Sequence, residues 1–425
     1  MKQKVSIYTF GCKMNQYESQ AMAEMLHDYE VGFSQDKADL FIVNSCTVTS
    51  EAERKLRQLF RRLKGLNPNS KIIITGCYSQ LSPNELRELG ADEVIGVKEK
   101  KAIHKYVSRQ LNRPDGVAPS EFLTVTSSIE GRTRAFLGIE DGCLNRCSYC
   151  SVRLARGSKI ISKPIDLVKR EFEGLVSRGY REIVLTGINI GYYGFDFDSS
   201  LVKLLIELDK LEGEWRIRLG SLDPDRVDGE LLHLITTSRR IARHLHLSLQ
   251  SGSDRILRAM GRKYTVDEYL RAVDRARSVD SRFAFTTDLI TGFPGENDSD
   301  HNESLKVVEQ VEFLKVHVFR FSRRPGTEAA EMKDQIDSGT KKARSHELIE
   351  AGKRSRKKYL ERQIGRKASV LIQKTGHTES SGFDEFYAPH AIEGAHEGFV
   401  NATIISIESQ REGSDAELYC RSVVR

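Results

Sequence analysis

Short apolar runs alternate with amphipathic stretches through the first quarter of the chain. Three of these runs read KVSIYTF (4–10), ADLFIVN (38–44) and SKIIITG (70–76), and polar, helix-like stretches separate them. Strands that alternate with helices in this way form parallel sheets covered by the helices. The pattern therefore predicts an open parallel α/β domain over residues 1–115, followed by the turn-rich segment NRPDGVAPS (112–120).

The same alternation resumes after this segment. The strand candidates are RAFLGIE (134–140), REIVLTG (181–187), WRIRLGS (215–221), HLHLSLQ (244–250), FAFTTDLITG (283–292) and LKVHVFRFS (314–322). Amphipathic stretches such as PIDLVKREFEGLVSRG (164–179) lie between them. Six such units are too few for a closed barrel of the eight-stranded kind. We therefore expect a partial, open (β/α)6 barrel over residues 129–360.

The pattern changes again over residues 363–425. KASVLIQK (367–374), FYAPHAI (386–392), GFVNATIISIE (398–408) and AELYCRSVV (416–424) are strand-like runs without helical stretches between them. This predicts a small antiparallel β-barrel, a shape that often binds nucleic acid. Its aromatic residues Phe383, Phe386 and Tyr387 are suited either to stacking on bases or to packing in the core.

Composition adds little to this picture, but the distribution of charge changes it. With 39% hydrophobic and 30% charged residues, no long apolar run and no signal-peptide core after Met1, the chain is expected to be cytoplasmic, without a membrane partner. Residues 341–367 hold eleven Lys or Arg against three Glu, and residues 50–65 form a second basic stretch. Either run alone could be a solvated helix face. Together with the β-barrel they favour RNA, rather than DNA, as a partner.

Three cysteines occupy equivalent places in the first domain. Cys12, Cys46 and Cys77 each follow a predicted parallel strand directly. Because the carboxyl ends of parallel strands meet at one edge, these thiols are expected to converge on one metal site. The alternative is three buried structural cysteines, since unpaired Cys is among the most buried residue types.

A second trio, Cys143, Cys147 and Cys150, has the spacing C-x3-C-x2-C after the first barrel strand. An iron–sulfur cubane with three cysteine ligands keeps one iron open, and a small molecule can chelate it there. The alternative is a zinc site whose fourth ligand is the distant His244 or His246.

A C-x3-C-x2-C loop that opens a partial βα barrel resembles the radical S-adenosylmethionine (SAM) superfamily. With TFGCKMNQYES (9–19), VNSCTVTSEAERKLRQ (43–58), TGCYSQ (75–80), HLHLSLQSGSDRILRAMGRKYT (244–265), TDLITGFPGE (287–296) and FRFSRRPGTEAAEM (319–332), the whole chain resembles the methylthiotransferases. The resemblance implies an N-terminal cluster domain, a radical SAM core and a TRAM RNA-binding domain. It also implies two [4Fe–4S] clusters held by the two cysteine trios, SAM, and a one-electron donor protein.

Polar residues at barrel strand ends are the candidate SAM contacts: Gly187, Ser221, Asp223, Gln250 and Asp288. Each is equally suited to a strand-end turn. Arg323 and Arg324 follow the last barrel strand, and their guanidinium groups match a carboxylate or a phosphate of the substrate.

The motifs most resemble the branch that acts on threonylcarbamoyladenosine. That resemblance implies conversion of N6-threonylcarbamoyladenosine 37, in the anticodon stem-loop of tRNA, to its 2-methylthio derivative. The alternatives are a methylthiotransferase for N6-isopentenyladenosine 37 or for a ribosomal protein, and an RNA-binding Fe–S sensor without turnover.

Overall fold

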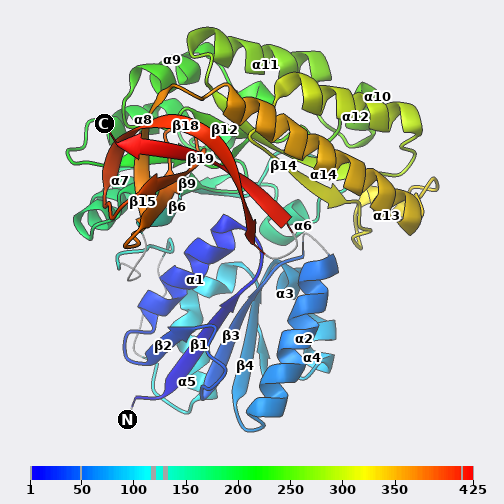
Figure 1. The fold of residues 1–425 in the computed structure, drawn as a ribbon. Helices are drawn as coiled ribbons and strands as arrows, with labels where there is room; N and C mark the ends of the chain where they lie inside the picture. The colour runs from blue at the N-terminus through cyan, green and yellow to red at the C-terminus, as the bar shows by residue number, and fades with distance from the viewer. Residues whose placement is uncertain (1, 48–49, 116–120, 128–132, 413–414, 425) are drawn as a thin grey trace.

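The computed structural model describes residues 2–47, 50–115, 121–127, 133–412 and 415–424. Its first part is a parallel sheet with the strand order β2-β1-β3-β4-β5 (Figure 1). The predicted strands are β1 (Lys4–Thr9), β3 (Leu40–Ser45) and β4 (Lys71–Gly76). The short edge strands β2 (Glu30–Phe33) and β5 (Glu93–Val94) were not predicted. The open parallel α/β fold is confirmed.

Helices cover both faces of this sheet because its central strands are apolar on both sides. Helices α1 (Lys13–Met25) and α5 (Ile103–Gln110) pack on one face, through Met22 and Val107. On the other face lie α2 (Ser50–Leu66) and α4 (Pro83–Glu88), while α3 (Cys77–Leu81) follows β4 and η1 (Lys98–Ala102) precedes α5. The helices therefore leave the carboxyl edge of the strands open toward the barrel (Figure 1).

The second part is the predicted partial barrel. Its strands are β6 (Arg134–Gly138), β9 (Glu182–Thr186), β10 (Arg216–Leu219), β12 (His244–Leu247), β13 (Ala284–Thr291) and β14 (Lys315–Arg320). Neighbouring strands within the two half-sheets pair in parallel, and a bridge between Ile217 and Ile241 joins the halves. The short strands are β7 (Glu140–Asp141), β8 (Ile161–Ser162) and β11 (Ser221–Leu222).

The helices around the barrel alternate with its strands. They are α6 (Val152–Arg156), α7 (Ile165–Ser177), α8 (Leu201–Asp209), α9 (Gly229–Thr237), α10 (Asp254–Ala259), α11 (Val266–Val279), α12 (Asp298–Val311), α13 (Glu328–Glu331) and α14 (Ser338–Glu361), with short 3-10 turns η2 (Ile190–Tyr192) and η3 (Pro224–Arg226). In the described part of the chain, no helix combines the length and the apolar character that a membrane crossing requires.

The barrel strands have one apolar face and one polar face. On β10, Ile217 and Leu219 join the core beneath the helices, so Arg216 and Arg218 face the lumen. The same alternation turns a set of charged and imidazole side chains toward the lumen: Glu182 of β9, His244 and His246 of β12, Asp288 of β13 and His317 of β14. The lumen is therefore a polar chamber rather than a second hydrophobic core.

The last part is a closed barrel in the order β15-β16-β17-β19-β18. Its strands are β15 (Lys367–Lys374), β16 (Glu379–Phe383), β17 (Pro389–Glu393), β18 (Phe399–Glu412) and β19 (Asp415–Val424). Strand β16 was not predicted, and β17 pairs with β19 in parallel, so the barrel is mostly but not wholly antiparallel. It lies beside β6 and β9 of the half-barrel (Figure 1).

The two basic stretches form helices whose charges are largely neutralised within the chain. On α2, Arg57 pairs with Glu85 and Arg62 with Asp36. On α14, Arg344 is buried against Glu296, and Arg356 donates a hydrogen bond to the Leu418 carbonyl of β19 at 2.6 Å. Much of this charge therefore serves packing, and fewer cations remain for RNA than the sequence suggested.

Candidate functional site

The first cysteine trio lies at one edge of the N-terminal sheet. Strands β1, β3 and β4 are neighbours in register, with Thr9 opposite Asn44 and Asn44 opposite Thr75. Cys12, Cys46 and Cys77 follow these strand ends, so the topology brings the three loops together as predicted. Cys46 and Cys77 are buried and Cys12 is exposed. Burial raises the pKa of the Cys77 thiol, and the nearby Cys12 raises it further.

Two glycines allow these loops to approach one another. Gly11 has a φ of +99°, and a Cβ there would lie 2.7 Å from Cys46 Sγ. Gly76 has a φ of +106°, and a Cβ there would clash with the Ser45 carbonyl oxygen. Both positions require a left-handed backbone and space for the neighbouring loop. Each glycine directly precedes a cysteine, so a larger side chain would displace the thiols themselves.

The second trio lies in the loop between β7 and α6. Burial raises the pKa of Cys143 to about 12 and that of Cys150 to about 11. Without a cation these thiols are therefore protonated at neutral pH, whereas metal ligation requires thiolates. Arg262, in the loop after α10, supplies one cation: its Nη1 donates to Cys147 Sγ at 3.1 Å.

The spacing of the thiols can be compared with the spacing that a single metal ion requires. Around one zinc ion with bonds of 2.3 Å, tetrahedral sulfur ligands lie about 3.8 Å apart. Among the described residues, no group of three cysteines has its sulfur atoms all within 4.8 Å of one another. Neither trio is therefore arranged closely around a single point in this structure.

The proposed fourth zinc ligands are engaged elsewhere. His244 Nε2 and His246 Nδ1 both lie within hydrogen-bond distance of Thr286 Oγ1, at 3.0 and 2.9 Å. His246 Nε2 also pairs with Asp288 at 3.3 Å. Neither imidazole has a cysteine partner among the described contacts, which disfavours the zinc alternative.

Asp223, one predicted SAM contact, is the centre of a hydrogen-bond network under the second trio. Its carboxylate accepts hydrogen bonds from Asn145 at 2.5 Å and from Asn189 at 2.8 Å, and it pairs with Arg262. Asn145 belongs to the cysteine loop and also accepts from the Tyr192 hydroxyl at 2.9 Å. Asp223 therefore fixes the loop, through partners that sequence reasoning did not single out.

The other predicted SAM contacts lie where the strands end. Gly187 is packed against Glu140, whose Oε2 would lie 2.5 Å from a Cβ at this position. Ser221 is half-buried at the start of β11. Gln250 adopts a φ of +68° and shares a pocket with Asp288 and Cys150. The pocket thus joins two predicted cofactor residues to a predicted cluster ligand.

The two arginines after β14 differ in environment. Arg324 is buried, and its Nη1 pairs with Glu53 of α2 at 2.5 Å. Glu53 in turn accepts a hydrogen bond from Thr47, next to Cys46, at 3.1 Å. Arg323 is exposed at the rim. Arg324 therefore connects the barrel to the first cysteine site, and a role in substrate binding stays a prediction for both residues.

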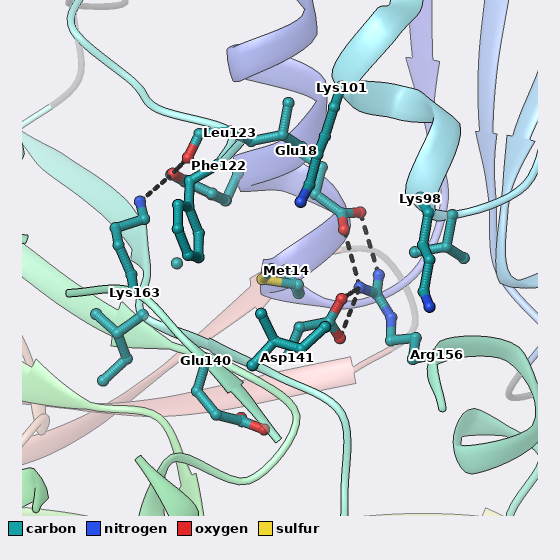
Figure 2. Close-up of a pocket in the computed structure, with 15 residues that line it drawn as sticks. Met14, Glu18, Lys98, Lys101, Phe122, Leu123, Glu140, Asp141, Arg156 and Lys163 are labelled. Carbon is teal, nitrogen blue, oxygen red and sulfur yellow. Dashed lines mark hydrogen bonds and ion pairs between the residues drawn. The ribbon is translucent and has the colours of Figure 1, made fainter. Parts of the chain in front are cut away.

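A buried ion-pair network fastens α1 to the loop of the second trio (Figure 2). Arg156 of α6 donates to Glu18 of α1 at 2.8 Å, to Asn15 at 2.9 Å and to Asp141 at 3.2 Å. Burial acts to raise the pKa of Glu18, but Arg156 and Lys100 lower it to about 2. This network lines a pocket at the seam between the two parts.

Asn15 extends the same network to the first trio. Its side-chain amide donates to the carbonyls of Phe10 at 2.7 Å and Ser45 at 3.1 Å, in the loops that carry Cys12 and Cys46. The two cysteine sites are therefore held in a fixed relation across the seam.

The C-terminal barrel closes one side of the lumen. Tyr387 lies over Arg218, with the guanidinium carbon 4.3 Å from the ring centroid, and over Arg134 at 5.3 Å. Burial acts to raise the pKa of Tyr387, but Arg134, Arg218 and Lys13 lower it. Phe383 stacks on Tyr387 at 5.0 Å and Phe386 is buried, so these aromatics serve packing in this structure.

Comparison with known proteins agrees with this architecture. Residues 4–96 match the family described as "Uncharacterized protein family UPF0004", and residues 139–308 match the radical SAM superfamily. A radical SAM methyltransferase from Kitasatospora setae, TsrM, is similar in fold at 15% identity, with a TM-score of 0.58 over 77% of this chain and 75% of that chain.

Curated relatives are more similar in sequence. The threonylcarbamoyladenosine tRNA methylthiotransferase MtaB of Thermotoga maritima is 45% identical over 93% of this chain and 92% of that protein. The tRNA-2-methylthio-N(6)-dimethylallyladenosine synthase of Ruegeria sp. is 33% identical over 88% of each. The chain therefore belongs to the tRNA methylthiotransferases of the radical SAM superfamily, in the branch named for threonylcarbamoyladenosine.

Proposed function

We propose that this transferase attaches a methylthio group to carbon 2 of N6-threonylcarbamoyladenosine 37 in tRNA. The observation that carries the proposal is the presence of two separate cysteine trios joined by Arg156, Glu18 and Asn15 at the mouth of one polar chamber. The similarity to MtaB relatives supports the choice of substrate.

The residues present fit two cofactor clusters. Each trio offers three thiols from loops fixed by backbone and hydrogen bonds, and neither trio is arranged closely around a single point. When bound, the clusters and SAM supply the radical that activates the C–H bond and the sulfur that replaces its hydrogen. Cys143, Cys147 and Cys150 would hold the SAM-binding cluster; Cys12, Cys46 and Cys77 would hold the second.

The chain's own residues orient these groups and keep the chamber closed. Asp223 fixes the cysteine loop through Asn145 and Asn189, and Arg262 neutralises charge at Cys147. Gly187, Ser221, Gln250 and Asp288 lie along the strand ends where SAM would extend. The buried ion pair between Arg156 and Glu18, and the packing of Tyr387 over Arg218, limit access of water to the chamber. Exclusion of water protects reactive species.

The tRNA substrate would reach the chamber from the side of the C-terminal barrel. We assign this role to the C-terminal barrel, residues 363–425, with exposed cations such as Arg366 and Lys367. A one-electron donor protein would reduce the SAM-binding cluster. We place the reaction in the cytoplasm, where tRNA is available.

Two triple variants test the assignment of the trios. After anaerobic reconstitution, replacing Cys143, Cys147 and Cys150 with Ala should leave about half of the iron, if both clusters are cubanes, and abolish formation of 5′-deoxyadenosine. Replacing Cys12, Cys46 and Cys77 should also halve the iron but leave SAM cleavage, while methylthio product disappears. Full iron content in either variant would show that the trios are assigned wrongly.

Nucleoside mass spectrometry tests the substrate. Transfer RNA from a host that lacks its own enzyme should gain 2-methylthio-N6-threonylcarbamoyladenosine when this gene is expressed. Methylthiolated isopentenyladenosine instead would overturn the substrate but not the reaction. An enzyme that retains its iron but forms no methylthiolated nucleoside would favour the alternative of an RNA-binding Fe–S sensor.

A further inference from the structure

Three guanidinium groups share one carboxylate at the deep end of the half-barrel lumen. Arg134, Glu182 and Arg216 are opposite one another in register on β6, β9 and β10, and Arg218 lies two residues further along β10. Arg218 Nη2 donates to Glu182 at 2.7 Å. The same carboxylate pairs with Arg134 Nε at 2.6 Å and with Arg216 Nη1 at 4.0 Å. Among the described residues, no other acidic side chain forms an ion pair with these arginines, so the deep lumen holds an excess of positive charge.

Two of these arginines keep nitrogen atoms without a hydrogen-bond acceptor. Arg216 donates to the carbonyls of Ser369 and Phe383, so its guanidinium holds the C-terminal barrel. Arg218 Nη1 and Arg134 Nη2, by contrast, are buried and have no acceptor in the described part of the chain. A buried donor without an acceptor costs free energy, and most of all when it is charged. Such a pair in a native protein points to an ion or a ligand group that binds there, and the group that fits two guanidinium groups is an anion.

The ring of Tyr387 holds both guanidinium groups in one place. The guanidinium carbon of Arg218 lies 4.3 Å from the ring centroid, and that of Arg134 lies 5.3 Å from it. A guanidinium that packs on an aromatic ring keeps its in-plane N–H groups available for an anion. The side chain of Arg218 is 2% exposed, whereas that of Arg134 is 20% exposed. Arg134 is therefore the end of the pair that a ligand reaches first.

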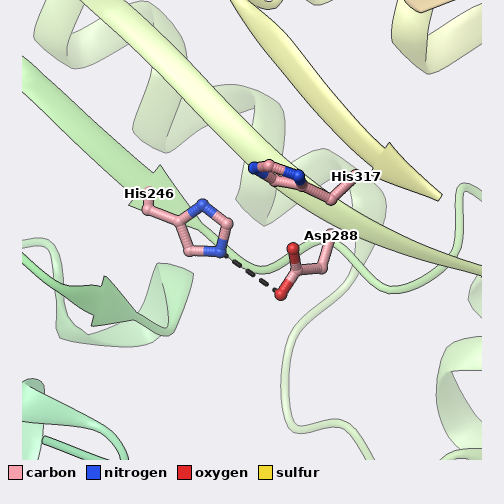
Figure 3. Close-up of side chains that lie close together, drawn as sticks. All are labelled: His246, Asp288 and His317. Atoms are coloured by element: carbon pink, nitrogen blue, oxygen red, sulfur yellow. Dashed lines mark ion pairs between the residues drawn. The ribbon is translucent and has the colours of Figure 1, made fainter. Parts of the chain in front are cut away.

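A second polar group in the lumen lies closer to the strand ends (Figure 3). His246 is opposite Ser221 in register, and Asp288 is opposite His317. The ligand atoms of the two histidines and Asp288 lie within 4.8 Å of one another, and His246 Nε2 pairs with Asp288 at 3.3 Å. This group has a carboxylate of its own, which repels a second carboxylate. An anion is therefore expected at the arginines, deeper in the lumen than this group.

We propose that Arg134 and Arg218 bind the carboxylate of the threonylcarbamoyl group at the deep end of the lumen. This inference rests on the proposed function and names the residues that determine its substrate specificity. A carboxylate taken from water into the lumen requires charged or hydrogen-bonding partners, and guanidinium groups match its geometry. An isopentenyl group has no polar atoms, so it would leave Arg134 Nη2 and Arg218 Nη1 without an acceptor.

The depth of the two arginines suits the substituent of the base rather than its ring. Arg218 precedes Ser221, a predicted SAM contact at the strand end, by three residues, which is about 10 Å along a strand. The threonylcarbamoyl group is bonded to N6 and places its carboxylate several bonds away from the ring. A carboxylate at the arginines is therefore compatible with a ring whose carbon 2 lies at the strand ends, where the SAM-binding cluster would be.

The arginines beyond β14 occupy a different place. Arg324 is buried against Glu53, which already supplies it with a carboxylate. Arg323 is exposed at the rim. Arg323 is therefore the competing partner for the carboxylate of the substrate, and the experiment includes it.

Binding measurements on the reconstituted enzyme without reductant test this proposal. Two anticodon stem-loops are compared: one with threonylcarbamoyladenosine 37, and one in which the carboxylate is a methyl amide. The unaltered enzyme should bind the acid about 10- to 100-fold more tightly than the amide, because only the acid forms charge-assisted bonds. This comparison does not depend on the folding of any variant. Arg134→Met should remove most of the difference by weakening binding of the acid alone, and Arg134→Lys should restore part of it.

The matched control is Arg181→Met, which replaces the arginine next to Glu182 that pairs with the exposed Glu214 instead. It should leave both affinities unchanged, and iron content should be the same in all variants. Equal affinity of the unaltered enzyme for acid and amide would overturn the proposal, because the arginines would then bind a free anion at most. A difference that survives in Arg134→Met but disappears in Arg323→Met would also overturn it. Failure of the proposed function is seen separately, as absence of methylthiolated product from the threonylcarbamoyl stem-loop with the unaltered enzyme.

Discussion

Arg156 and Glu18 form a buried ion pair across the seam between the N-terminal sheet and the half-barrel, with Nη1 2.8 Å from Oε1 and Nη2 3.1 Å from Oε2. Both side chains are almost completely buried, and Lys100 contacts the same carboxylate. The pair therefore connects the two cysteine sites through charges that are almost completely buried.

Removing one partner should destabilise the protein strongly, because the other charge remains buried. We expect Glu18→Gln to lower the free energy of unfolding by about 3–5 kcal/mol. Urea denaturation followed by circular dichroism measures this. The control Glu30→Gln removes an exposed pair with Lys4 and should change stability by less than about 0.5 kcal/mol. A small effect of Glu18→Gln would show that the network does not hold the seam.

The same pair predicts a dependence on pH. The pKa of Glu18 in the folded state, about 2, is below its ordinary value of 4.5. Its contribution to stability is therefore complete above pH 4.5 and is lost as the pH falls toward 2. Thermal denaturation between pH 3 and 7 should show a weaker slope for Glu18→Gln than for the unaltered chain; equal slopes would contradict this assignment.

Arg262 should tune the second cysteine site. Its guanidinium donates to Cys147 and pairs with Asp223, so Arg262→Gln removes a positive charge beside the site. Less positive charge stabilises the reduced cluster less, so the reduction potential should fall by an amount on the order of tens of millivolts. A redox titration monitored by electron paramagnetic resonance measures the shift. Arg258→Gln, on the exposed side of α10, is the control.

The two arginines beyond β14 should separate in their effects. Arg324→Ala leaves Glu53 without its buried partner and should cost about 1–3 kcal/mol of stability, with loss of product from any substrate. Arg323→Ala should leave the melting temperature unchanged, because the side chain is exposed, and should reduce turnover of the threonylcarbamoyl substrate selectively. Equal melting temperatures for both variants would refute the interface role of Arg324.

Salt dependence should locate the RNA-binding cations. Replacing the exposed Arg366, Lys367 and Lys374 of the C-terminal barrel with Gln should reduce the slope of log affinity against log salt by about 2. Replacing Arg54 and Lys55 of α2 should change it little, because Glu51 already pairs with both. The reverse result would place the RNA on the N-terminal helix.

The periodicity of apolar residues was sufficient to predict a helix or strand wherever one face of that element is apolar. It located β1, β3, β4 and all six barrel strands because their hydrophobic runs are continuous or alternate strictly. It did not find β2, β5 or β16, since strands of two to five residues are too short to show a clear alternation, and β2 and β16 also contain Gly. The parallel pairing of β17 with β19 depends on barrel closure, which local pattern cannot encode.

The cysteines of the candidate site were predictable because strand ends determine where they lie. The side chains that hold the cysteine loops in place could not be predicted from the sequence. Arg262 lies in the quoted segment 244–265 and Arg156 follows the second cysteine trio, but only the fold shows that they contact Cys147 and Glu18. The sequence also could not show how the basic residues of α2 and α14 are paired. That these stretches contact RNA stays a prediction, and contacts far apart in sequence neutralise many of their charges.

The hydrogen bonds between the half-barrel and the C-terminal barrel have a consequence for protein engineering. Arg216 donates to the carbonyls of Ser369 and Phe383, and Arg218 to that of Asp384, so the half-barrel relies on backbone atoms of the last barrel. A chimera that received a C-terminal barrel from another protein would need the same loop geometry, or two buried guanidinium groups would lose acceptors. The C-terminal barrel is thus a structural part of the half-barrel that it contacts, and it cannot be exchanged as an independent domain.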